Sequence, residues 1–148
     1  MKRFVIGDIH GGYKALIQCL DKSGFTKEED MLVCLGDVTD GWSETPECID
    51  TLLSILNLIY ITGNHDLFLQ RWFTYGDEPY IWLYQGGMAA KQTYVDRAMD
   101  KIPMHNKLFD NGKFYYILDN MLFIHGGYNI NKPLEATSPH DMVWDRDM

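Results

Sequence analysis

The stretch FVIGDIHGG at residues 4–12 decides the fold, because it runs from a short apolar segment straight into a polar, glycine-rich cluster. Its apolar part reads as a buried strand, and Asp8 and His10 follow where that strand ends. An apolar run followed by a glycine-flanked polar cluster recurs at residues 31–40 and 58–66. We therefore predict three buried strands with metal-capable side chains behind their carboxyl ends.

Amphipathic segments lie between these apolar runs. Residues 13–20 carry apolar side chains at helical spacing before Gly24, and the TPE sequence at residues 45–47 is typical of a helix start. This alternation of strands and helices predicts a mostly parallel α/β sheet. Further helices are expected over residues 65–73, 87–99 and 105–109, and a hairpin is expected over residues 114–124.

Length and charge limit the class of protein. The 148 residues fit one domain, to which we assign residues 1–148. Acidic residues outnumber basic ones by 21 to 13, and the net charge of −8 argues against a nucleic-acid partner. The apolar runs are too short for a membrane span, so no membrane partner is expected. Three cysteines without a CxxC pair favour a reducing, cytoplasmic location.

The polar clusters are expected to meet in one crevice, because open α/β sheets bind ligands beyond the carboxyl ends of their strands. The metal-capable side chains expected there are Asp8, His10, Asp37, Asp40, Asn64, His65, Asp66 and His125. Several carboxylates held this close need cations to stay ionised. Oxygen and imidazole donors without thiolate suit manganese, iron or zinc, and the number of ligands favours two divalent metal ions over one.

Four motifs resemble those of the calcineurin-like metallophosphoesterases: GDIHGG at residues 7–12, GDVTD at 36–40, GNHD at 63–66 and HGG at 125–127. Within that superfamily the chain is similar to bacterial and phage serine/threonine protein phosphatases and to symmetrical bis(5′-nucleosyl)-tetraphosphatases. The resemblance implies a metallophosphoesterase-type βαβαβ sandwich with helices on both sides.

The resemblance also implies a ligand set for two divalent metal ions, with manganese as the expected metal. Asp8 and His10 would bind the first ion. Asp37 would bridge both ions, and Asn64 and His125 would bind the second.

The remaining roles follow from the same resemblance. His65 would protonate the leaving oxygen as the general acid, and Asp40 would hold its imidazole. A neighbouring carboxylate is what orients and charges an imidazole, which agrees with this assignment. Asn64 and Arg146 would bind the substrate phosphate.

The chain departs from the family pattern in three places. Gly41-Trp42 follows Asp40 where the family usually has Arg-Gly, and Thr62 stands where an arginine often precedes the GNH motif. The family also takes a last histidine ligand from a GH motif that this sequence does not contain. We therefore expect the domain to lack its C-terminal part, with an incomplete second sheet whose unpaired edge favours self-association.

Two histidines and an aromatic stretch lie outside the motifs. His140 occupies a polar SPHD turn and is not expected to replace the missing ligand. His105 is expected to be a surface residue or a helix cap. The aromatic residues between positions 72 and 84 are expected to pack on the core as a lid, rather than to stack on nucleobases.

These expectations describe a metal-dependent hydrolase of phosphomonoesters, of serine/threonine protein phosphatase type, in which a metal-bridging hydroxide attacks phosphorus. Its partner would be a phosphorylated protein or a small phosphoester. Two alternatives stay open: a bis(5′-nucleosyl)-tetraphosphatase-like hydrolase, and a non-catalytic remnant that binds metal or phosphate. The negative charge disfavours a nuclease.

Overall fold

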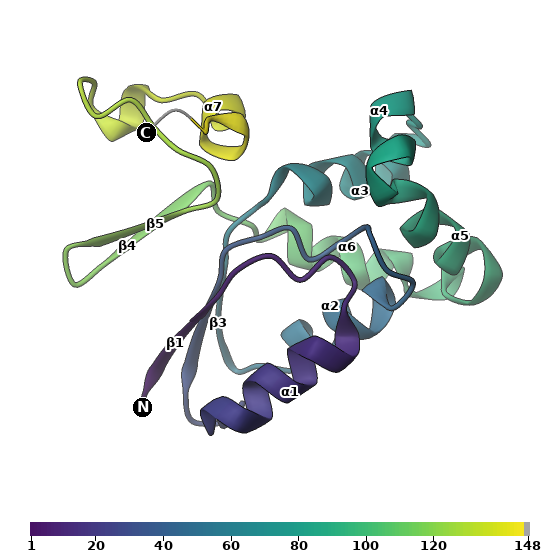
Figure 1. Cartoon of the computed structure of the whole chain (residues 1–148), viewed down its shortest axis with the longest axis horizontal. Coiled ribbons are helices and arrows are strands. Elements are labelled where there is room, and N and C mark those ends of the chain that lie inside the picture. Colours follow the sequence, from purple (N-terminus) through teal and green to yellow (C-terminus); the bar gives the residue numbers. More distant parts are fainter. Residues whose placement is uncertain (147–148) are drawn as a thin grey trace.

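The computed structural model describes residues 1–146 and contains a three-stranded parallel sheet and a two-stranded hairpin (Figure 1). The parallel strands, in spatial order, are β1 (Arg3–Ile6), β2 (Met31–Cys34) and β3 (Asn57–Tyr60). Ile6 pairs with Cys34, which pairs with Tyr60 on its other side. The three carboxyl ends are therefore level, and the predicted α/β class with a parallel sheet is confirmed.

Helices and helical turns follow the strands. They are α1 (Tyr13–Ser23), α2 (Thr45–Leu53), α3 (Asn64–Tyr75), α4 (Tyr80–Trp82), the kinked π turn η1 (Leu83–Gly87), α5 (Met88–Arg97), η2 (Met99–Lys101), α6 (Ile102–Asp110), η3 (Leu134–Ala136) and α7 (Pro139–Trp144). Gly24 ends α1 in a left-handed conformation (φ 68°), as expected for a glycine after a helix. Over the described residues, every helix falls short of the length and apolarity that crossing a bilayer requires.

The hydrophobic core lies between the parallel sheet and the helices. Leu32, Cys34 and Tyr60 point from the strands into it and meet Ile49 and Leu52 of α2. Such alternation along a strand directs every second side chain to the same face. This face therefore supplies the apolar burial that holds the strand ends in register.

The aromatic stretch divides between core and surface. Trp82 is fully buried, and its ring centroid lies 6.2 Å from that of Trp72. Phe73 packs edge-on against buried Tyr94 with centroids 4.8 Å apart. Tyr80 and Tyr84, by contrast, stack on each other and are exposed. The expected core packing is thus correct for Trp72, Trp82 and Phe73, and wrong for this tyrosine pair and for Tyr75, which is also exposed.

The predicted hairpin is present as β4 (Tyr115–Leu118) and β5 (Met121–Ile124). Asp119 and Asn120 both have positive φ, which is what a tight two-residue hairpin turn requires. An ion pair between Asp119 and Arg3 ties the hairpin tip to β1. Figure 1 shows α1 and α2 on one side of the parallel sheet and the hairpin on the other, and this hairpin is the small second sheet that accompanies the parallel one.

His105 is a core residue, and its predicted surface or capping position is wrong. The side chain is fully buried within α6. Its Nδ1 lies 2.5 Å from the Tyr94 hydroxyl of α5, and its Nε2 lies 2.9 Å from Asp50 Oδ1 of α2. These partners satisfy both ring nitrogens, which is why a polar side chain is stable at this depth.

Candidate metal centre

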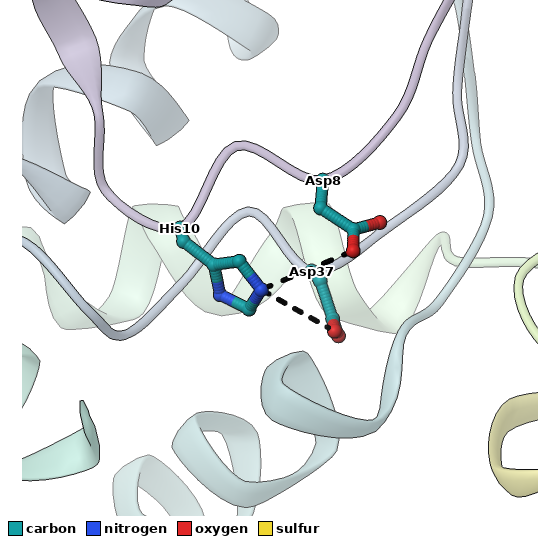
Figure 2. Close-up of side chains that lie close together, drawn as sticks. All are labelled: Asp8, His10 and Asp37. Atoms are coloured by element: carbon teal, nitrogen blue, oxygen red, sulfur yellow. Dashed lines mark ion pairs between the residues drawn. The ribbon is translucent and has the colours of Figure 1, made fainter. Parts of the chain in front are cut away.

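Asp8, His10 and Asp37 meet beyond the carboxyl ends of β1 and β2 (Figure 2). One ligand atom from each lies within 4.8 Å of the other two. His10 Nε2 is 4.0 Å from Asp8 Oδ2 and 3.8 Å from Asp37 Oδ2. The first predicted ligand group is therefore brought together, with its donors facing a common point.

The backbone around His10 fixes which ring nitrogen faces the carboxylates. His10 Nδ1 lies 3.0 Å from the Thr39 carbonyl, so Nδ1 carries the proton that is donated to that oxygen. Nε2 is left with its lone pair toward Asp8 and Asp37. Metal-binding histidines use this arrangement, with one nitrogen donating to a carbonyl and the other ligating.

A second group forms on the other side of Asp37. His125, which directly follows β5, places its Nε2 3.4 Å from Asp37 Oδ2 and 3.2 Å from Asn64 Oδ1. Its Nδ1 lies 2.7 Å from the Leu35 carbonyl and donates to it, so Nε2 is the nitrogen that faces Asp37 and Asn64. Carboxylate, amide oxygen and imidazole are a donor set that suits a divalent transition metal. The residues present thus fit a second ion as well as a first.

Asp37 occupies the position between the two groups. Its Oδ2 faces the Nε2 atoms of both His10 and His125, while its Oδ1 accepts a hydrogen bond from the His65 backbone at 3.0 Å. Burial favours the neutral acid, but the hydrogen bond and charge of His125, together with His65, outweigh it and lower the pKa of Asp37. Asp37 is therefore ionised at neutral pH, as a metal ligand must be.

His65 and Asp40 form a buried pair beside this centre. His65 Nδ1 is 2.8 Å from Asp40 Oδ2, and the same oxygen accepts a 2.8 Å hydrogen bond from Trp82 Nε1. Burial lowers the pKa of His65, but the hydrogen bond that it donates to Asp40 and the charges of the nearby carboxylates raise it by more. The pKa of Asp40 is raised because burial outweighs its two hydrogen bonds. The pair has the geometry of a proton donor held by a carboxylate.

Asp66 has a structural role that the sequence did not indicate. It is fully buried, and its carboxylate accepts hydrogen bonds from the backbone of Asp37, Val38 and Gly63 at 2.8–3.0 Å. A carboxylate is suited to this task because one oxygen can accept from several N–H groups. Asp66 therefore shapes the loop that presents Asp37, and does not join the ligand groups.

Arg146 lies beside the second group, and His140 does not. Arg146 Nη2 is 3.4 Å from Asn64 Oδ1, and its Nη1 contacts the Val143 carbonyl at 3.2 Å. His140 lies on α7 with a side chain that is 76% exposed, and its ring stacks on Trp144. The geometry therefore groups Arg146 with Asn64, and phosphate binding by the two residues stays a prediction.

A parallel sheet that delivers carboxylates and imidazoles to its carboxyl edge defines the class of α/β metallohydrolases. A model of the calcineurin-like phosphoesterase family matches residues 1–147, and the chain belongs to this family. The resemblance drawn from the four motifs is confirmed at this level.

Similar proteins carry two kinds of name. The asymmetrical bis(5′-nucleosyl)-tetraphosphatase PrpE of Anoxybacillus flavithermus is 27% identical in an alignment of 143 residues, gaps included, that covers 83% of this chain and 56% of that protein. Serine/threonine-protein phosphatase 2 of Escherichia coli is 37% identical in an alignment of 87 residues that covers 57% of this chain and 38% of that protein. A solved structure provisionally assigned as a diadenosine tetraphosphatase shares the fold, with a TM-score of 0.71 at 18% identity over 94% of this chain and 56% of that one. The chain thus spans between 38% and 56% of the length of these three proteins.

Proposed function

We propose that this chain is a metal-dependent phosphoesterase that hydrolyses phosphomonoesters, with a phosphorylated serine or threonine as the first candidate substrate. The observation that carries the proposal is the position of Asp37 between the imidazoles of His10 and His125, with the His65–Asp40 pair next to it. One carboxylate shared by two ligand groups is the arrangement that a two-ion site needs.

The residues divide the work between binding and proton transfer. Asp8, His10 and Asp37 would hold one divalent ion, and Asp37, Asn64 and His125 would hold the other. Bound ions, of which manganese is our first choice, would supply Lewis acidity and activate water at neutral pH. Arg146 would hold phosphate oxygens through its guanidinium, whose fork of N–H groups matches them.

His65 would donate the proton that the leaving oxygen needs. Asp40 occupies its Nδ1, which leaves Nε2 as the nitrogen that can donate to substrate. The raised pKa keeps the imidazole protonated nearer to neutral pH, which a general acid requires.

Removal and return of metal tests the proposal. The chain stripped with a chelator should hydrolyse neither p-nitrophenyl phosphate nor a phosphoserine peptide, and added manganese should restore both activities. A chain that stays inactive with saturating manganese would support the non-catalytic alternative instead. We place the reaction in the cytoplasm, which is supported by three free cysteines.

A dinucleoside tetraphosphate is the second candidate substrate, and Trp42 is the observation that favours it. Its side chain is 69% exposed, and its backbone N–H donates to the carbonyls of His10 at 3.0 Å and Asp40 at 2.8 Å. An exposed indole anchored next to a ligand offers a face for a nucleobase, and such stacking contributes roughly 1–3 kcal/mol per base. Trp42→Ala should then raise KM for the dinucleotide about tenfold and leave KM for the phosphopeptide unchanged.

A further inference from the structure

We propose that Trp82 is a positioning residue for the general acid, and that it acts on His65 through Asp40. The inference rests on the proposed function of His65. Trp82 Nε1 and His65 Nδ1 each lie 2.8 Å from the same carboxylate oxygen, Asp40 Oδ2. An indole on α4 is thereby linked to the imidazole at the start of α3 through one shared acceptor.

The shared oxygen needs a second donor because Asp40 is cut off from water. Asp40 is fully buried, and its backbone is in the left-handed region with φ 71°. Its other oxygen, Oδ1, has no hydrogen-bond partner among the described residues. Without Trp82, the bond from His65 would be the remaining side-chain hydrogen bond on this carboxylate, and the carboxylate would be free to turn about its side-chain torsion.

Trp82 can hold Asp40 only because its own position is fixed. The indole is fully buried and packs against the ring of Trp72, with centroids 6.2 Å apart. A Cβ on Gly87 would lie 2.2 Å from Trp82 Nε1, so a side chain at position 87 would displace the donor. The glycine therefore leaves the space that the indole N–H needs to reach Asp40.

The same turn also holds the backbone next to Asp40. Gly86 has φ 109°, and its carbonyl accepts a 3.2 Å hydrogen bond from the Gly41 N–H. A Cβ on Gly86 would lie 2.7 Å from the Gly41 nitrogen. Residues 82–87 thus hold the Asp40 region by two hydrogen bonds. One runs from the Trp82 indole to the Asp40 carboxylate, and the other runs from the Gly41 N–H to the Gly86 carbonyl.

The contact has a definite chemical consequence. The Trp82 N–H fixes the orientation of the Asp40 carboxylate, because Oδ2 accepts from the indole and from the imidazole together. The carboxylate held in this way orients the His65 ring through Nδ1, so that Nε2 is the nitrogen that faces the leaving oxygen. Loss of the indole donor should therefore damage proton donation and leave phosphate binding intact.

The test compares Trp82→Phe with Trp72→Phe, which keeps an aromatic ring packed against Trp82 and removes only an N–H that donates to Glu78 at 3.1 Å. With manganese bound, Trp82→Phe should lower kcat about tenfold for phenyl phosphate, whose leaving oxygen needs a proton. The loss should be less than threefold for p-nitrophenyl phosphate, and KM should not change. Trp72→Phe should leave both rates within twofold of wild type. In a His65→Asn background, Trp82→Phe should have no further effect, because residues that act as a unit are not additive.

A second measurement does not depend on turnover. The four tryptophan indole N–H signals can be assigned by ¹⁵N–¹H spectra of the Trp→Phe variants. Asp40→Asn should move the Trp82 signal and leave that of Trp72 in place. Gly87→Ala should move the Trp82 signal as well, which keeps the inference testable if Trp82→Phe does not fold.

These measurements test the role of Trp82 separately from the proposed phosphoesterase function. Three results would each overturn the role of Trp82. Trp82→Phe could lower kcat equally for both phosphate esters, or Trp72→Phe could lower kcat by as much as Trp82→Phe does. The third such result is a Trp82 indole N–H signal that does not move in Asp40→Asn. A wild-type chain that is inactive on both phosphates would count against the proposed function, and the indole spectra would still decide whether Trp82 holds Asp40.

Discussion

At the scale of single residues, hydrogen bonds to the main chain make His10 and His125 suitable ligands. Each donates from Nδ1 to a carbonyl, that of Thr39 or of Leu35, and each directs Nε2 to Asp37. A fixed tautomer and a fixed ring orientation make an imidazole a better ligand than free rotation would allow. Residue type alone does not give this property, because it depends on which carbonyl lies beside each ring.

Loss of one imidazole should therefore remove one ion. His125→Ala should lower the bound manganese from two ions per chain to one, because Asp8, His10 and Asp37 remain. Elemental analysis after dialysis gives the count. His140→Ala is the matched control, since His140 lies exposed on α7 and should leave the count at two. Two bound manganese ions per chain in His125→Ala would show that His125 is not a ligand of the second ion.

Proton donation should depend on His65 and on the leaving group. His65→Asn should lower kcat by roughly 10²–10⁴ for phenyl phosphate and by much less for p-nitrophenyl phosphate. The manganese content should stay the same, because His65 contributes its backbone N–H to Asp37 and its ring to Asp40. Steady-state rates on the two esters measure the difference, and equal losses would remove His65 from the role of general acid.

At the scale of elements, short apolar runs that end in glycine predicted the parallel strands well. The runs at residues 4–6, 31–35 and 58–61 fall within about one residue of the observed strands. A buried strand is a local pattern, and parallel strands align their carboxyl ends, so the gathering of the polar clusters followed from the same pattern.

Contacts between distant elements could not be predicted in this way. Trp82 lies 42 positions from Asp40, and their hydrogen bond depends on the kinked turn at residues 83–87. The local sequence likewise predicted His105 to be a surface residue, because its partners Tyr94 and Asp50 lie on other helices, α5 and α2. Side-chain partners across helices depend on packing, which the local sequence does not encode.

The contacts of His105 predict a stability effect. His105→Ala should lower the free energy of unfolding by about 2–4 kcal/mol, because it opens a cavity and leaves the Tyr94 hydroxyl unpaired. Thermal or urea unfolding measures this loss. Lys107→Ala, at an exposed position on the same helix, is the control and should change stability by less than about 0.5 kcal/mol.

The free energy of unfolding should depend on pH in a way that reflects the buried imidazole of His105. Burial lowers the pKa of His105, with Asp50 opposing the shift, so the folded chain binds a proton less readily than the unfolded one. Between the folded pKa and the unfolded value of about 6.5, the unfolded state holds more protons, and stability falls as the pH falls. Wild type should therefore lose more unfolding free energy than His105→Ala between pH 7.5 and 5.5. A steeper loss in the variant would contradict the burial of a neutral imidazole.

At the scale of the whole molecule, the hairpin is the surface most open to association. β4 and β5 pair only with each other among the described residues, and Ile117 and Met121 are exposed on them. Open strand edges with apolar side chains favour pairing between copies. Wild type should self-associate as its concentration rises, and Ile117→Lys should weaken this association. Sedimentation velocity tests both, and a chain that stays monomeric at all concentrations would exclude the hairpin as a contact.

We propose that one carboxylate, Asp37, joins the two metal positions and thereby gives the chain its phosphoesterase activity. The most direct measurement is manganese content together with hydrolysis of p-nitrophenyl phosphate in Asp37→Asn, with Asp21→Asn on the exposed face of α1 as the control. We predict that Asp37→Asn loses manganese from both positions and at least 10²-fold in kcat/KM, since a shared ligand serves both ions, while Asp21→Asn matches wild type. If Asp37→Asn kept the manganese content and the rate of wild type, Asp37 would not be the ligand shared by the two ions.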